Sequence, residues 1–189
     1  MKNSDNPTQA KAVENKNKEA VVKPADDAAK ELRELFIDSL KDIYWAENAL
    51  VGALPKMAAN ASDPGLASAI KEHHSITQNQ VARLEKVFAI LGEKAQGKKC
   101  DAMEGLLKEG DSILEETVPG PVRDAGIIAA SQKIEHYEIA TYGTLCAFAK
   151  TLGENDAAKL LTQTLAEEKE ADCLLNDIAL NAVNITAAV

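Results

Sequence analysis

Apolar residues recur at intervals of three and four along several long stretches of the chain. In residues 29–60 the repeat includes Leu32, Leu35, Phe36 and Leu40. This spacing places the side chains on one face of an α-helix. The same pattern predicts further helices over residues 66–91, 101–117, 122–152 and 156–181. Pro55 falls late in the first stretch, where it would kink the last turn or end the helix early.

Turn signals divide these helices into two hairpins. The sequence NASDPG separates the first two long helices, and Gly153 separates the last two. Between the hairpins lie about 30 residues, which contain the shorter amphipathic stretch 101–117 and the sequence PGP. Four long helices joined by one long crossover are the connectivity of ferritin-like bundles. We therefore expect an all-α, ferritin-like four-helix bundle with a short extra helix in the crossover.

The two ends of the chain lack this periodicity. Residues 1–28 are polar and rich in Asn, Lys, Asp and Ala, so the sequence predicts a disordered tail there. Residues 29–182 form the predicted bundle, and residues 183–189 are expected to fray.

Composition limits the partners and the compartment. The net charge of −9 disfavours nucleic acid and acidic membranes as partners. No apolar stretch approaches the roughly 20 residues of a membrane span, and the first residues lack the apolar core of a signal peptide. The three cysteines, interpreted as small core residues, form no CxxC pair, which favours the reducing cytoplasm.

Polar residues interrupt the apolar face of every long helix. They occupy positions where the three-and-four spacing calls for an apolar side chain. The interruptions are Glu47 in the first helix, His73 and Thr77 in the second, Glu135, Glu138 and Tyr142 in the third, and Glu168 and Asp172 in the fourth.

These interruptions fall at one depth in the predicted bundle. Glu47 lies 15 residues before the first turn and Thr77 lies 15 after it; Glu138 and Glu168 flank the second turn in the same way. At about 1.5 Å of rise per residue, all four lie roughly 22 Å along their helices. The polar side chains are therefore expected to meet in one layer.

A metal centre is the chemistry that this layer favours. Buried carboxylates are costly unless they are paired or bound to metal, and His73 is the one cationic candidate expected in the interior. We predict a dinuclear site of iron or manganese, with zinc less suitable, whose ligands come from Glu47, His73, Glu135, Glu138, Glu168 and Asp172. Thr77, Tyr142 and His136 are candidates to support those ligands.

Two structural readings compete with this prediction. A single inward Glu or His is more often a hydrogen-bonded core residue than a ligand. A helix rotated by about 100° from the predicted orientation would also turn its carboxylates to solvent. The convergence of all four helices on one depth favours the metal site.

Five segments resemble the YciE/YciF-type ferritin-like proteins, a bacterial stress-associated family. They are LFIDSLKDIYWAENAL, KEHHSITQNQVARLEKVF, CDAMEGL, VRDAGIIAASQKIEHYEIATYGTL and LLTQTLAEEKEADCLL, and they lie within about residues 30–182. The resemblance implies the ferritin-like fold, a homodimer and a candidate dinuclear metal site. Better-known di-iron bundles carry Glu-x-x-His on two helices, whereas here Ile70 precedes His73 and Ala171 follows Glu168.

Two main functions are compatible with these features. The first is a metal-dependent redox protein that consumes peroxide or oxidises Fe(II). The second is a non-catalytic stress protein that the metals stabilise, or that sequesters metal. An interaction module with an empty polar core ranks last.

Overall fold

The computed structural model describes residues 22–189, and its helical bundle begins at Glu31. Most of the predicted tail, residues 1–21, lies outside the described residues. No strand occurs in the part of the chain that is described. The long helices are α2 (Leu32–Asn60), α3 (Pro64–Leu91), α4 (Asp101–Glu116), α5 (Pro121–Thr151) and α6 (Asn155–Ile178). The predicted all-α class is therefore confirmed, and α2 continues through Pro55 to its predicted end.

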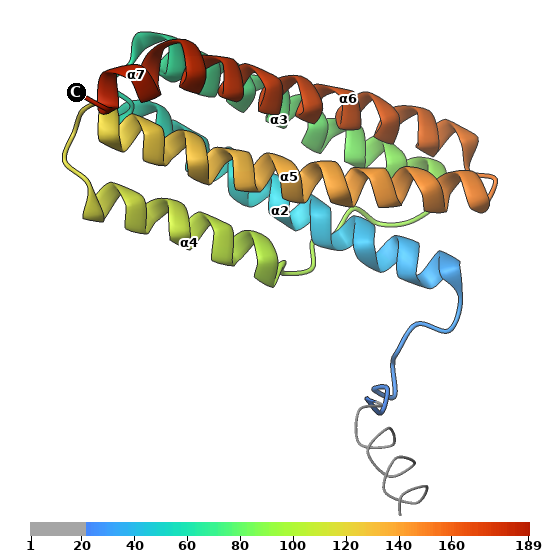
Figure 1. Cartoon of the computed structure of the whole chain (residues 1–189). Helices are drawn as coiled ribbons and strands as arrows, with labels where there is room; N and C mark the ends of the chain where they lie inside the picture. Colours follow the sequence, from blue (N-terminus) through green and yellow to red (C-terminus); the bar gives the residue numbers. More distant parts are fainter. Residues whose placement is uncertain (1–21) are drawn as a thin grey trace, which may run out of the picture. The chain divides into compact units, whose positions relative to one another are not determined.

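Helices α2, α3, α5 and α6 form the four-helix bundle that the connectivity predicts. Helices α2 and α3 make one hairpin and α5 and α6 the other, and they dock through contacts of α3 with α6 and of α2 with α5. Figure 1 shows the four helices side by side, with α4 lying along the outside of the bundle. Helix α4, which belongs to the long crossover, packs on α5 and α2. This arrangement confirms the ferritin-like fold.

Glycine allows α4 to lie close to its neighbours. A Cβ atom on Gly110 of α4 would come within 2.7 Å of Met57 Cε, and one on Gly126 of α5 within 2.6 Å of Ile113 Cγ2. A side chain at Gly110 would have to displace the flexible end of Met57, and one at Gly126 would have to displace the Ile113 methyl group. Helix α4 therefore packs closely on its neighbours at Gly110 and Gly126. The spacing of apolar residues does not predict these two contacts.

A buried aspartate joins the two hairpins at one end of the bundle. Asp124 lies in the first turn of α5 and is only 2% exposed. Its carboxylate accepts the backbone N–H groups of Ser62 (2.7 Å) and Asp63 (2.9 Å) in the α2–α3 turn. Asp63 in turn caps α3 by accepting the N–H of Leu66 at 2.8 Å. The turn between α2 and α3 is therefore fixed to the start of α5.

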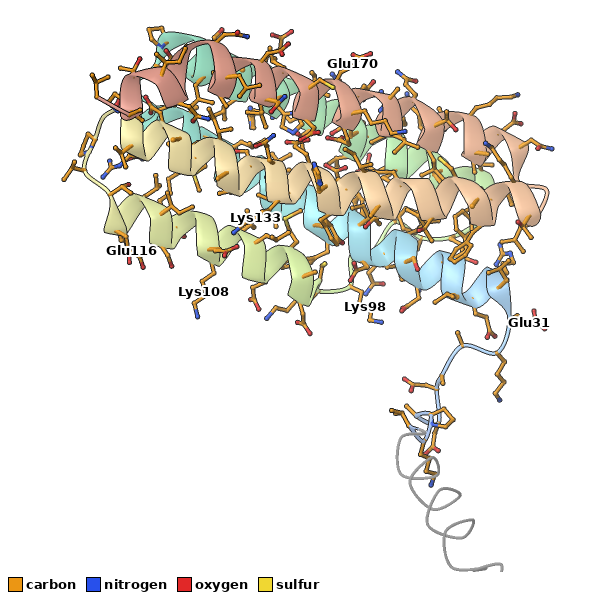
Figure 2. The ribbon with its side chains drawn as sticks, viewed as in Figure 1. Glu31, Lys98, Lys108, Glu116, Lys133 and Glu170 are labelled. Atoms are coloured by element: carbon orange, nitrogen blue, oxygen red, sulfur yellow. The ribbon has the colours of Figure 1, made fainter. Side chains whose placement is uncertain are left out.

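The core is mainly aliphatic, and most charged side chains outside the central layer and Asp124 lie on the surface. Figure 2 shows Lys108 and Glu116 projecting outward from α4. Lys133 of α5 pairs with Glu109 of α4 at 2.9 Å, but both are half exposed, so this pair contributes little to stability. Cys100 and Cys146 are buried, whereas Cys173 is exposed, which corrects the prediction that all three are core residues. Within residues 22–189, no helix has the length and apolarity that crossing a bilayer requires.

The C-terminal end is helical where the sequence predicts fraying. Helix α6 passes into a π-helical turn, η1 (Ala179–Val183), and then into α7 (Asn184–Ala187). Val183 is 3% exposed, because η1 and α7 pack against α5. The π turn changes the spacing of apolar residues at this end. The three-and-four spacing of an α-helix therefore does not predict the helical C-terminal end.

Replacing Asp124 tests the link between the hairpins. Asp124→Ala leaves two backbone N–H groups without their acceptor, so we expect the free energy of unfolding to fall by about 2 kcal/mol. Urea denaturation measures this change. The matched control is Asp111→Ala, whose carboxylate is half exposed and pairs only with Lys56, and whose loss should cost about 0.5 kcal/mol or less. Equal effects of the two substitutions would contradict the assignment.

Candidate metal centre

Buried side chains from all four long helices meet at the middle of the bundle. His73 of α3, Glu135 and Glu138 of α5, and Glu168 of α6 each offer a ligand atom, and these four atoms all lie within 4.8 Å of one another. Glu47 of α2 is fully buried, and its charge interacts with those of Glu168 and Glu138. The structure therefore brings five of the six predicted ligands into one cluster.

Helical spacing explains how α5 contributes twice. Glu135 and Glu138 are three residues apart, so they project from the same face, and Tyr142 lies one turn further on. The Tyr142 hydroxyl is fully buried and donates a hydrogen bond to Glu47 Oε1 on the neighbouring helix. Tyr142 therefore orients Glu47, as predicted for a supporting residue.

Most polar atoms of the cluster have no hydrogen-bond partner. Among the buried side-chain atoms of residues 22–189, the unpartnered ones include both oxygens of Glu138, both ring nitrogens of His73, and one oxygen each of Glu47, Glu135 and Glu168. Buried polar groups are normally satisfied, and a bound cation would satisfy this concentration of acceptors. Imidazole and carboxylate are suitable ligands for iron, manganese and zinc. The side chains present therefore fit a metal centre.

Burial shifts the carboxyl pKa values upward. Removal from water, followed by repulsion from neighbouring carboxylates, raises the pKa of Glu47, Glu135 and Glu138 well above the ordinary value. Burial likewise raises the pKa of Glu168 to about 7. Without a cation the cluster therefore retains protons at neutral pH, and bound cations would displace them.

His73 is neutral in this environment. Burial lowers its pKa to about 4, so at pH 7 both forms of the folded protein, metal-free and metal-bound, carry an uncharged imidazole. Its Nε2 atom lies 3.4 Å from Glu135 and 4.0 Å from Glu168. These contacts are not ion pairs at neutral pH. They place a neutral nitrogen donor beside two carboxylates, which is the state a metal ligand requires.

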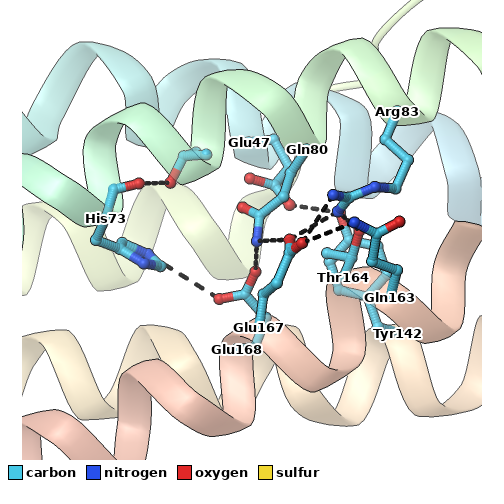
Figure 3. A network of polar contacts seen from close by, with 10 residues as sticks. Glu47, His73, Gln80, Arg83, Tyr142, Gln163, Thr164, Glu167 and Glu168 are labelled. Atoms are coloured by element: carbon cyan, nitrogen blue, oxygen red, sulfur yellow. Dashed lines mark hydrogen bonds and ion pairs between the residues drawn. The ribbon is translucent and has the colours of Figure 1, made fainter.

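A charged network that the sequence did not reveal borders the cluster. Arg83 of α3, only 9% exposed, donates to both carboxylate oxygens of Glu167 at 2.7 and 2.8 Å. Gln80, also buried, donates to Glu167 at 3.2 Å and to Glu168 (Figure 3). Partial burial by itself raises the pKa of Glu167, but the contacts with Arg83 outweigh it and leave that pKa below its ordinary value.

This network corrects the expectation that His73 is the one cationic residue in the interior. On α3, Gln80 is buried, whereas the neighbouring Val81 is only half-buried. The spacing from His73 through Thr77 to Gln80 is the signal that could have shown this. No comparable signal indicates Arg83, because its guanidinium is buried by reaching across to α6, where it also donates to Thr164 at 2.7 Å.

The remaining predicted residues lie at the edge of the cluster or outside it. Asp172 is partly exposed, and its carboxylate lies 3.3 Å from His136 Nε2 at the surface. Thr77 is buried, but its hydroxyl donates to the backbone carbonyl of His73 within the same helix, at 2.9 Å. His136 itself is 70% exposed in its side chain, so it contacts Asp172 rather than the five-residue cluster.

The pKa shifts predict how pH affects the metal-free protein. A carboxyl whose pKa is higher in the folded state stabilises the fold below its unfolded pKa, and this contribution is lost as pH rises through the folded pKa. For Glu168 that window runs from 4.5 to about 7. For Glu47, Glu135 and Glu138 the folded-state pKa is likewise raised, well above 4.5. His73 acts in the opposite sense, but mainly below 6.5.

In the presence of a chelator we therefore expect the melting temperature to fall between pH 5 and pH 7, because the carboxyls whose pKa is raised outnumber His73, which acts in the opposite sense. The slope is about 1.4 kcal/mol per pH unit for each carboxyl that stays protonated in the folded state. Glu138→Gln, which cannot titrate, should show a shallower fall in thermal denaturation than the parent protein. Identical slopes for the two proteins would contradict the buried, protonated state of Glu138.

The residues of the bundle are similar in sequence to those of known proteins. The model of a family described as a domain of unknown function, DUF892, matches residues 31–188. Protein YciF of Escherichia coli K12 is 46% identical over 156 residues, which cover 82% of this chain and 94% of YciF.

Solved structures show the same fold. The E. coli stress protein YciF superposes with a TM-score of 0.79 at 45% identity, covering 82% of this chain and 99% of that one. YcfI of Rhodopseudomonas palustris gives a TM-score of 0.79 at 42% identity, covering 81% of this chain and 98% of that one. A Xanthomonas campestris protein gives 0.63 at 25% identity, with coverages of 81% and 94%. The family match over residues 31–188, and relatives whose own length is covered almost completely, show that the chain belongs to the DUF892 family.

Proposed function

We propose that this chain is a stress-associated ferritin-like protein that binds a dinuclear iron or manganese centre and consumes peroxide or oxidises Fe(II). The observation that carries the proposal is the group of unpartnered carboxylate oxygens and imidazole nitrogens buried between the four helices. The E. coli relative is described as a stress protein, which supports the cellular context. The cytoplasm and a homodimeric assembly remain predictions from the sequence.

Charge balance supports two divalent ions. Glu167 is already paired with Arg83, which leaves Glu47, Glu135, Glu138 and Glu168 without a buried cation. Two divalent ions would balance these four carboxylates, while one would leave a net negative charge in the interior. We assign the five clustered side chains, including His73, as the ligands. Asp172 would join them only by leaving its contact with His136.

The ligand set favours iron or manganese over zinc. Four carboxylates and a single imidazole make an oxygen-rich environment, which suits these metals at high coordination numbers, whereas zinc sites are usually tetrahedral and richer in nitrogen or sulfur. When bound, a pair of such ions can supply the two electrons that, with two protons, reduce a peroxide ROOH to ROH and water, each ion being oxidised by one electron.

The surrounding residues orient the ligands and handle protons. Tyr142 holds Glu47 through its hydroxyl, and Gln80 holds Glu168 through its amide. Arg83 keeps Glu167 ionised and apart from the cluster, so Glu167 does not compete for the metal. Protons held by the raised-pKa carboxyls leave when cations bind, which couples metal affinity to pH.

A non-catalytic, metal-stabilised protein is the alternative function. The presence of one inward imidazole, rather than two Glu-x-x-His motifs, is the observation that favours it. In that case the ions hold the helices together. Their removal lowers the stability of a protein that has no catalytic activity.

Metal loading should stabilise the bundle. Adding Mn(II), or Fe(II) without oxygen, to chelated protein at about one hundred times the dissociation constant should add about 2.7 kcal/mol. For a chain of this size we expect the melting temperature to rise by about 5–10 °C. Elemental analysis should find two ions per chain.

The matched variants are Glu138→Gln, which should abolish most of the shift, and Glu109→Gln on the exposed face of α4, which should retain it. A parent protein that melts at the same temperature with and without these metals would overturn the proposed site.

Peroxide consumption separates the two functions. The metal-loaded protein should consume hydrogen peroxide in a dioxygen- or absorbance-based assay, and Glu138→Gln should lower kcat/KM at least about tenfold. Metal-dependent stabilisation without turnover, or equal turnover by Glu138→Gln, would exclude the redox function and leave the structural one.

A further inference from the structure

A pocket leads from the surface to the candidate metal centre. It lies between α3, α5 and α6 and has a volume of about 190 Å³. Glu72 and Glu170 are exposed at its mouth, and Figure 2 shows Glu170 on the outer side of α6. Its inner end reaches His73 and Glu135. The pocket is thus a route between solvent and two of the proposed ligands.

The walls of this pocket are apolar. They are formed mainly by Leu54, Ala69, Ile70, Ile76, Ala171 and Leu175. Leu174 lies at the rim and is 46% exposed. Ser131 and Glu167 add polar atoms to the lining, but most of the lining offers no ligand or hydrogen-bond partner to a metal ion or to water. The lining indicates that part of the molecule entering the pocket is hydrocarbon.

The inner end of the pocket is polar and unsatisfied. His73 is 9% exposed and Glu135 3%, and the two ring nitrogens and Glu135 Oε2 have no hydrogen-bond partner. A molecule that fills the pocket would therefore present its innermost atoms to groups that can donate or accept a hydrogen bond. Apolar walls with a polar end fit an amphipathic small molecule whose polar end points inward.

We propose that this pocket binds the hydrocarbon part of a small organic hydroperoxide and directs its peroxide end to His73 and Glu135. This inference rests on the proposed function and specifies the substrate class of that site. An apolar cavity of about 150 Å³ accommodates benzene, so the pocket has room for a ring or branched alkyl group of that size with a short polar end. The reaction balance is that given above, with an alcohol and water as products.

Binding can be tested without turnover by using the alcohol product class as the probe. We would titrate cyclohexanol into the chelated, full-length protein and follow the side-chain methyl signals of Ile76, Leu174 and Leu175 by NMR. We expect saturable shifts at these residues. Absence of any shift, or shifts confined to other parts of the molecule, would overturn the inference.

Two substitutions should fill the pocket from opposite walls. Ala171→Leu acts from α6 and Ala69→Leu from α3, and each should weaken cyclohexanol binding at least about tenfold. The matched control is Ala166→Leu, the same change at an exposed position of α6, which should bind as the parent protein does. Having variants on two helices keeps the test valid if one of them fails to fold.

Turnover gives a second readout that distinguishes the substrate class. In a single-turnover reaction, protein loaded with two Fe(II) ions per chain should reduce one cumene hydroperoxide with two electrons and two protons from solvent, giving the alcohol and water and two Fe(III) ions. Ala171→Leu should slow this reaction about tenfold more for cumene hydroperoxide than for hydrogen peroxide. Equal losses for both peroxides, or no loss for either, would contradict the inference.

The pocket and the metal centre can fail separately. Metal-dependent stabilisation without cyclohexanol binding overturns the pocket assignment and leaves the centre intact. Cyclohexanol binding without metal-dependent stabilisation supports the pocket as an apolar binding site and overturns the metal centre.

Discussion

Several carboxylates lie in the interior of the bundle, away from water. The free-energy cost of burying them there is the constraint that the rest of the site must meet. Each would lose several kcal/mol of hydration if it remained charged, and four of them within one layer also repel one another. The bundle has two ways to tolerate them, which are to keep them protonated or to bind cations. The raised pKa values favour the protonated state, and the unpartnered oxygens are available to bind cations. The cluster is therefore a place where protons and cations would compete for the same oxygens.

The fold positions this layer by joining two hairpins that cannot assemble it alone. Glu47 and His73 come from the first hairpin, and the carboxylates of α5 and α6 come from the second. Contacts between the hairpins then fix individual oxygens, as when Tyr142 donates to Glu47 and Gln80 to Glu168. These two contacts join residues of the first hairpin to residues of the second within the central layer.

The sequence predicted the helices and the depth of the site because both follow from regular spacing. The same regularity placed Glu135 and Glu138 on one face and His73 opposite them. It failed where a side chain is long or a helix is locally irregular. Arg83 is buried by reaching across to Glu167, Asp172 turns toward His136, and the π turn at Ala179–Val183 alters the repeat. Gln80 follows His73 and Thr77 at the spacing of one helix face, but the sequence analysis did not single it out.

Asp124 gives the junction between the hairpins a spectroscopic signature. Its carboxylate holds the amides of Ser62 and Asp63, which lie in a turn where amides would otherwise exchange rapidly with solvent. Exchange at these two positions therefore records how often the hairpins separate. Since the ligands are divided between the same two hairpins, the lifetime of those two amide protons is also a measure of how long the ligand set stays assembled.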